Sequence, residues 1–159
     1  MLFRSLPVEL EVLGLKELAQ QAAAEYDDRF QTAGLTLVMN APEEDVMVVA
    51  DGRHLWRVLD NLLSNCAKYS LEGTRVYAEV ERFADCAELR VKNISREALN
   101  VDPDTLMERF VRGDESRTTE GSGLGLSIAR SLTDLQVGSF RIDIDGDLFK
   151  ATVRLPLAE

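Results

Sequence analysis

The stretch NLLSNCAKYS, residues 61–70, carries an apolar stripe and a polar strip along what we expect to be one helix. We predict a helix over residues 51–69 with Asp51 as its N-cap. Its apolar positions recur at helical spacing: Leu55, Val58, Leu59, Leu62, Leu63 and Cys66. At about 100° per residue, Asn61, Asn65 and Lys68 fall within about 60° of one another beside that stripe.

These three polar residue types indicate a site for a phosphorylated ligand. An amide oxygen such as that of Asn65 suits Mg²⁺ when phosphates supply the remaining charge, and the ammonium of Lys68 suits a phosphate. Tyr69 adds an aromatic face one residue later. The alternative is an ordinary solvated helix edge, because Asn and Lys are common surface residues.

A second feature is the glycine-rich run GSGLGLS, residues 121–127. Gly121, Gly123 and Gly125 alternate just before a predicted helix, which lets the backbone approach a ligand closely. Free backbone N–H groups at a helix N-terminus bind anions. The run therefore favours phosphate binding, with a plain flexible loop as the alternative.

Around these two features the pattern predicts one domain of helices and hairpins. We expect a first helix from Leu15 through Phe30, ended by Gly34, and a last helix from about residue 124 to Gly138. Strands are expected at residues 35–39, 46–50, 75–83, 88–93, 140–144 and 149–155. Asp145-Gly146 is a strong hairpin signal. The prediction is a two-layer α/β sandwich, a mixed, mainly antiparallel sheet of about five strands packed on three helices.

Two segments fall outside this pattern. Residues 1–7 lack periodicity, and we expect them to be a linker remnant. Residues 94–122 form a long, mostly polar stretch with one short helix, capped by Asp102. A weakly structured segment of this length inside a compact domain is typical of a functional lid.

Composition narrows the function classes. The 159 residues carry a formal net charge of −10, which argues against a nucleic-acid partner. A single histidine excludes a multi-histidine metal site, and two cysteines make no disulfide framework. No apolar run approaches the ~20 residues needed to span a bilayer. We therefore expect no direct membrane contact by this domain.

Three short motifs together resemble those of bacterial two-component sensor histidine kinases. Residues 61–70 resemble the asparagine box of that family, residues 108–112 (ERFVR) its phenylalanine box, and residues 121–129 its second glycine box. Their order and separations fit as well. The resemblance implies a catalytic, ATP-binding domain over residues 8–159 with the Bergerat fold, which gyrase and the mismatch-repair ATPases share. Its lid would span about residues 94–122.

The resemblance also implies roles for the residues of the asparagine box. Asn65 would coordinate Mg²⁺ through its side-chain oxygen, and Asn61 would lie beside it at the triphosphate of ATP. Lys68 would contact phosphate, and Tyr69 would pack on the adenine.

Further roles fall on the lid and the glycine run. Arg112 would approach the γ-phosphate when the lid closes, so Arg112 and Lys68 are the expected catalytic residues. The phosphates would be cradled by the run that contains Gly121, Gly123, Leu124 and Gly125.

One motif departs from the family pattern. The family's first glycine box reads Asp-x-Gly-x-Gly, and its Asp accepts a hydrogen bond from the adenine amine. Residues 93–97 read NISRE, so Asn93 aligns with the Asp and both glycines are missing. An Asn carbonyl still accepts from an amine, as a neutral acceptor. We therefore expect Asn93 to bind adenine, with less strength.

The function implied by the resemblance is transfer of the γ-phosphate of Mg-ATP to a histidine on a separate dimerisation domain. The expected partners are that histidine-bearing domain in a homodimer and a downstream response regulator. The domain would lie in the cytoplasm, with the parent protein in the bacterial membrane.

Three alternatives remain open. A water-directed ATPase of the same fold carries a Glu where this chain has Asn61, and an amide cannot act as a base. A serine kinase of the anti-sigma type also tends to carry that Glu. The third alternative is a non-catalytic nucleotide-binding regulatory module, which the altered first glycine box favours.

Overall fold

A five-stranded sheet forms one layer of the molecule. The structure, a computed structural model, describes residues 7–99 and 124–158. The strand order is β2-β4-β5-β7-β6, and only the β2–β4 pair is parallel. The strands span Thr36–Asn40 (β2), Arg75–Arg82 (β4), Cys86–Ile94 (β5), Ser139–Asp145 (β6) and Leu148–Pro156 (β7). The predicted mixed, mainly antiparallel sheet is confirmed.

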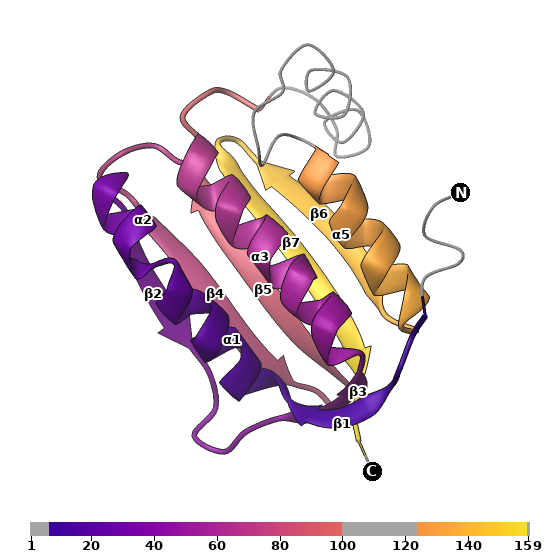
Figure 1. The fold of residues 1–159 in the computed structure, drawn as a ribbon. Helices are drawn as coiled ribbons and strands as arrows, with labels where there is room; N and C mark the ends of the chain where they lie inside the picture. The colour runs from indigo at the N-terminus through magenta and orange to yellow at the C-terminus, as the bar shows by residue number, and fades with distance from the viewer. Residues whose placement is uncertain (1–6, 100–123, 159) are drawn as a thin grey trace.

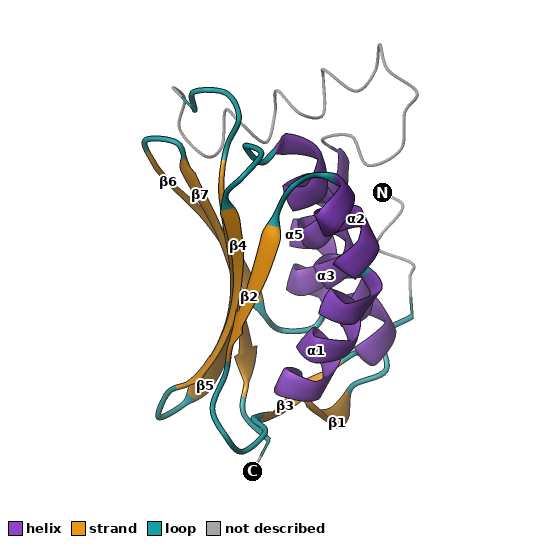
Figure 2. Cartoon of the chain, turned by 90° about the vertical axis from the view of Figure 1, so that its left-hand side faces the viewer, coloured by secondary structure: helices purple, strands orange, loops and turns teal. Residues whose placement is uncertain are grey.

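The second layer consists of helices on one face of this sheet (Figure 2). The described helices are Leu15–Glu25 (α1), Asp27–Thr32 (α2), Gly52–Tyr69 (α3) and Leu124–Leu135 (α5). Helices α3 and α5 lie side by side, and α5 starts at the end of the molecule where α3 finishes (Figure 1). The two-layer α/β sandwich predicted from the sequence is therefore the observed architecture.

The first helix differs from the prediction because it breaks at Tyr26. The backbone there leaves helical geometry at φ −101° and ψ 3°, and α2 continues after it. The Tyr26 hydroxyl donates to a carboxylate oxygen of Asp60 on α3, 2.5 Å away. The break lets one residue of the first helical segment bond to the central helix.

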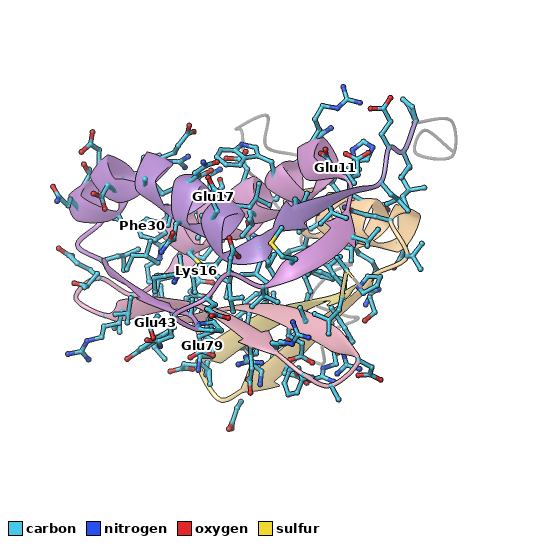
Figure 3. The ribbon with its side chains drawn as sticks, turned by 90° about the horizontal axis from the view of Figure 1, so that it is seen from below. Glu11, Lys16, Glu17, Phe30, Glu43 and Glu79 are labelled. Carbon is cyan, nitrogen blue, oxygen red and sulfur yellow. The ribbon has the colours of Figure 1, made fainter. Side chains whose placement is uncertain are left out.

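Two short strands form a separate ribbon, of which the sequence predicted one strand and not the other. The predicted strand at residues 46–50 is β3 (Met47–Ala50), which pairs antiparallel with β1 (Glu11–Gly14) and lies outside the main sheet. A bridge between Val48 and Leu157 ties the ribbon to the chain just after β7. The Lys16 ammonium donates to the carbonyls of Pro42 and Glu43 in the loop before β3, and Figure 3 labels Lys16 and Glu43.

The core lies between the two layers, where the inward-facing residues of the strands pack against the apolar stripe of α3. Alternate residues of β4 and β5 turn toward the helices and are buried, among them Val76, Val80, Leu89 and Val91. Phe30 of α2 lies between the layers with 1% of its surface exposed (Figure 3). The expected apolar stripe of α3 is buried in full.

The opposite face of the sheet carries paired charges. Arg90 on β5 donates to carboxylates of Glu79, Glu81 and Glu88, and Arg154 on β7 also donates to Glu88. Figure 3 labels Glu79 on this side of the molecule. Burial opposes ionisation of Glu88, but Arg154 and Arg90 outweigh it and hold the pKa of that carboxyl below its usual value. Within residues 7–99 and 124–158, no helix is long and apolar enough to span a membrane.

Candidate functional site

The end of α3 and the end of β5 are joined by backbone hydrogen bonds. The N–H of Leu71 donates to the carbonyl of Ile94 at 2.8 Å, and the N–H of Arg96 donates to that of Tyr69 at 2.9 Å. Ser70 and Ser95 form an isolated antiparallel bridge between these contacts. The last turn of α3 is therefore fixed against the strand that carries Asn93.

A pocket of about 300 Å³, its open mouth included, lies at this junction. Its lining residues come from α3, from β5 and the loop after it, and from β7: Asn65, Tyr69, Asn93, Ser95, Leu99 and Phe149. Among the described residues, the lining holds aromatic and apolar groups with a few neutral polar ones and carries no acidic or basic side chain. Such a lining suits a neutral planar ring better than a phosphate.

Asn93 is one of the polar groups that line this pocket. It occupies the inward row of β5 after Leu89 and Val91, and 5% of its surface is exposed. Its Nδ2 donates to the Ser70 hydroxyl at 2.8 Å. Phe149 is its direct partner on β7, which places an aromatic ring beside the amide.

Asn65 and Tyr69 project from α3 into the same pocket, one turn apart. Asn65 is a polar residue, yet it is buried, with 7% of its surface exposed. Its neighbour on the helix, Cys66, belongs to the apolar core. The structure therefore brings together three of the residues predicted from the sequence: Asn65, Tyr69 and Asn93.

Lys68 lies on a different side of α3. It lines a shallow groove of about 620 Å³, open to solvent, with Ala67 of α3 and the α2 segment that contains Asp28, Arg29 and Thr32. The groove borders the helix that also forms the pocket, so the cation stands at the edge of the site rather than within the pocket. The polar strip predicted on α3 is thus divided, because Asn65 lines the pocket and Lys68 lines the groove; the phosphate contact of Lys68 stays a prediction.

Asn61 lies one turn before Asn65 and lines neither cavity. Its Nδ2 is buried and has no hydrogen-bond partner among residues 7–99 and 124–158. Within the described part of the chain, the NH₂ group of Asn61 is therefore a buried donor without an acceptor.

Several predicted residues lie outside the described residues: Arg112, Gly121, Gly123 and the short helix after Asp102. Leu124 and Gly125 form the first turn of α5 in the structure. The beginning of α5 and the end of α3 lie at the same end of the molecule (Figure 1). The described part of the glycine run, residues 124–127, therefore lies at this end of the molecule.

A magnesium site made by protein groups alone is not found in the described part of the chain, which contains no cluster of three or more His, Cys, Asp or Glu side chains suited to a metal. The buried amide of Asn65 offers one oxygen ligand of the kind that Mg²⁺ takes. The donor set therefore fits Mg²⁺ only as a complex in which phosphates supply most ligands.

The start of α3 is fixed by Asp51, as predicted. Its carboxylate accepts from the backbone N–H of His54 at 3.1 Å and from that of Glu9 at 2.8 Å. Burial raises the pKa of this carboxyl, but the two N–H donors and the neighbouring His54 lower it by more, so the net pKa lies below its usual value. This cap sets the direction of the helix that presents Asn65 and Tyr69.

Sequence reasoning missed the other walls of the pocket. Phe149 reads as a core residue of a strand, and Leu99 and Ser95 fall in the expected lid. Ser70 closes the asparagine box but shows no pattern of its own. Only the register of β5 on β7 and the bridge to α3 bring these residues together.

Comparison with known proteins shows the family of the chain. Residues 50–159 match the family model described as histidine kinase-, DNA gyrase B-, and HSP90-like ATPase. The chain is 36% identical over 115 residues to the probable sensor protein PcoS of Escherichia coli, which covers 71% of this chain and 25% of that protein. It is 32% identical over 141 residues to the sensor histidine kinase WalK of Bacillus subtilis, covering 83% of this chain and 23% of the relative.

A solved structure has the same fold. The catalytic domain of histidine kinase ThkA superposes with a TM-score of 0.77 at 22% identity, covering 95% of this chain and 99% of that one. This likeness shows the fold, and the family model gives the class, an ATPase domain. The chain belongs to the family of histidine kinase-, DNA gyrase B- and HSP90-like ATPases, as a catalytic domain of the sensor histidine kinase kind. It spans about a quarter of the length of the curated relatives it matches.

Proposed function

We propose that this domain binds Mg-ATP and donates the γ-phosphate to a histidine on a separate dimerisation domain. The observation that carries the proposal is the neutral pocket between Tyr69, Asn93 and Phe149, with the buried amide of Asn65 in its wall. A purine ring fits such a pocket, and an amide oxygen beside it suits a magnesium phosphate complex.

Each residue has a distinct task in this proposal. Tyr69 and Phe149 contact the faces and edge of the base, and Asn93 accepts from its amine. Asn65 supplies an oxygen to Mg²⁺, which when bound neutralises part of the triphosphate charge. Lys68 offsets charge on the phosphates from the edge of α3.

Two parts of the proposal depend on residues outside the described ranges. Gly121 and Gly123, together with Leu124 and Gly125 of α5, would contact the phosphates through backbone N–H groups. Arg112 approaches the γ-phosphate. Phosphoryl transfer depends mainly on positioning and charge neutralisation, so Arg112 and Lys68 would act without forming a covalent intermediate.

The proposal extends to the partners of the domain and to its location. The acceptor is the histidine-bearing domain of the parent kinase, which we propose to be a homodimer that signals to a response regulator. The relatives are named sensor proteins and sensor histidine kinases. We propose that the domain lies in the cytoplasm and that its parent protein lies in the membrane.

The test is titration calorimetry with ATP, with and without Mg²⁺. We expect wild-type affinity to depend on Mg²⁺, and Asn65→Ala to lose that dependence while it retains its fold. Asn40→Ala is the matched control, because Asn40 is an exposed residue at the end of β2 and lines neither cavity. Absence of heat at millimolar Mg-ATP would refute the nucleotide site.

A second function, a non-catalytic nucleotide-binding regulatory module, is favoured by one observation. Asn93 gives the pocket a neutral amide where the kinase family has a carboxylate. The two functions are distinguished by adding the dimerisation helices of the parent protein in trans. Labelling of those helices from γ-labelled ATP supports the kinase, and binding without transfer supports the module.

A further inference from the structure

A side-chain hydrogen bond joins Asn93 of β5 to Ser70, the residue that follows α3. Nδ2 of Asn93 donates to the Ser70 hydroxyl at 2.8 Å. Both residues are buried, with 5% of each exposed. Asn93 lines the pocket, and because Nδ2 is bonded to Ser70 we infer that Oδ1 is the amide atom available to a bound base.

An amide differs from a carboxylate because it can reverse its hydrogen-bonding character. Rotation by half a turn exchanges a carbonyl acceptor for an NH₂ donor. A carboxylate presents acceptors in either orientation. The group at position 93 therefore decides whether that side chain can offer a donor to a bound base.

Ser70 can support both orientations of that amide. A hydroxyl accepts through its lone pairs and donates through its proton. In the observed orientation the Ser70 hydroxyl accepts from Nδ2; after rotation it would donate to Oδ1 at the same place. Each orientation keeps one hydrogen bond between the two residues, so neither leaves the buried amide without its partner.

The two orientations match the two kinds of purine. At position 6, adenine carries an amine that donates, and guanine and hypoxanthine carry an oxygen that accepts. We propose that Asn93 and Ser70 form a reversible purine-reading pair, so that this pocket accepts 6-oxopurine nucleotides as well as ATP. The inference rests on the proposed nucleotide site and names its substrate class.

The first test is the affinity of the wild-type chain for Mg-ATP and for Mg-ITP, measured by titration calorimetry. Inosine carries the 6-oxo group without the extra 2-amino group of guanine, so it isolates the position that Asn93 reads. We expect the two dissociation constants to agree within about tenfold, since each base finds a partner of the right kind. A preference for ATP of more than about a hundredfold would overturn the inference.

The second test replaces the amide by a carboxylate. Asn93→Asp removes the donor orientation and places a negative charge near the 6-oxo group. We expect the ratio of ITP to ATP dissociation constants to rise at least tenfold. Asn40→Asp adds the same charge at an exposed position on β2 and should leave the ratio unchanged. An unchanged ratio in Asn93→Asp would overturn the inference.

The third test removes the supporting hydroxyl. Ser70→Ala should weaken both nucleotides by a similar factor, because both amide orientations lose the same partner, and Ser70→Thr should restore both. Selective loss of one nucleotide would show that Ser70 supports a single orientation and would refute the reversible pair. Failure of the wild-type chain to bind either nucleotide is a different result, which refutes the proposed function itself.

Discussion

The side-chain oxygen of Gln136 accepts a hydrogen bond from the backbone N–H of Asp51, 2.9 Å away. Asp51 caps the start of α3, and Gln136 follows the last residue of α5, so one bond joins two helices across 85 positions of sequence. Both residues are buried. The helices that carry Asn65 and the glycine run are thereby fixed together at the end opposite the pocket.

The Asp51 carboxylate should make stability depend on pH in the acid range. Its pKa in the folded chain lies below its usual value, so its contribution is present above that usual value and is lost as pH falls through the folded pKa. We expect Asp51→Asn, which keeps a capping acceptor, to lose less free energy of unfolding than the wild type between roughly pH 5 and pH 2. Urea denaturation at several pH values measures this.

The control for this prediction is Asp28→Asn, which changes an exposed carboxylate on α2 and should leave the acid dependence as in the wild type. Asp51→Ala, which removes the cap as well, should cost about 1–2 kcal/mol at neutral pH. An acid profile of Asp51→Asn identical to that of the wild type would contradict the role given to this carboxylate.

Val137 should be a site where a smaller residue stabilises the protein. It adopts φ +62°, a left-handed conformation that β-branched residues disfavour, and 71% of its surface is exposed. Replacement by glycine relieves strain of about 1–2 kcal/mol, offset in part by the greater freedom of glycine in the unfolded chain. We expect Val137→Gly to raise the melting temperature by about 2–4 °C. Val137→Ala keeps the Cβ atom and should gain less; a lower melting temperature for the glycine variant would refute the strain.

The two thiols should differ in reactivity. Burial raises the pKa of Cys66 to about 12, and its side chain is enclosed in the core beside the pocket. Cys86 is only partly buried. Because the thiolate is the reactive form, Cys66 should resist iodoacetamide until the domain unfolds.

The measurement is mass spectrometry of Cys86→Ser after a brief iodoacetamide pulse in increasing urea. Labelling of the remaining thiol should follow the unfolding curve seen by circular dichroism. Rapid labelling of Cys66 in the native chain would show that the end of α3 opens locally.

The domain alone should not phosphorylate itself. His54 and Asn65 lie on the same helix, roughly 16 Å apart along its axis at about 1.5 Å per residue, whereas transfer needs contact of about 3–3.5 Å. The His54 ring also makes a 2.8 Å contact from Nε2 to the carbonyl oxygen of Pro7. We expect no acid-labile label on this chain from γ-labelled ATP, and restored labelling when the dimerisation helices are added.

Two variants complete that experiment. Arg112→Ala should slow transfer to the added helices far more than it weakens ATP binding, because the charge it offsets develops in the transition state. His54→Ala should leave transfer unchanged. Label on the isolated chain that disappears in His54→Ala would overturn the assignment of His54 to a structural role.

Local patterns were sufficient to predict the helix α3 and most of the main sheet. The apolar residues from Leu55 to Cys66 recur with the helical period alone. The Asp-Gly pair at residues 145–146 is typical of a two-residue hairpin turn. The strand β1 was missed because its four residues do not alternate between apolar and polar side chains before α1 begins. Its pairing with β3 is a tertiary contact that local sequence does not indicate. The break at Tyr26 was missed because the apolar period continues through it.

The site was predictable where its chemistry lies on one helix. Asn65 and Tyr69 are one turn apart, so helical geometry alone places them together. The pocket also needs Phe149 and Ser95, which come close only through the register of β5 on β7 and the bridge to Ser70. Sequence patterns report period and turn type but not which distant strands become neighbours.

The register that sets Asn93 opposite Phe149 also bears on the order in which the chain folds. The β4–β5 and β6–β7 pairs are local hairpins, which form in microseconds, whereas the β5–β7 pair that unites them must close a long loop first. Contacts of high sequence separation slow folding. The walls of the pocket therefore belong to different early-forming units, and the pocket arises only when those units dock. Nucleotide should accordingly act on the native state alone, slowing unfolding while leaving the rate of refolding unchanged.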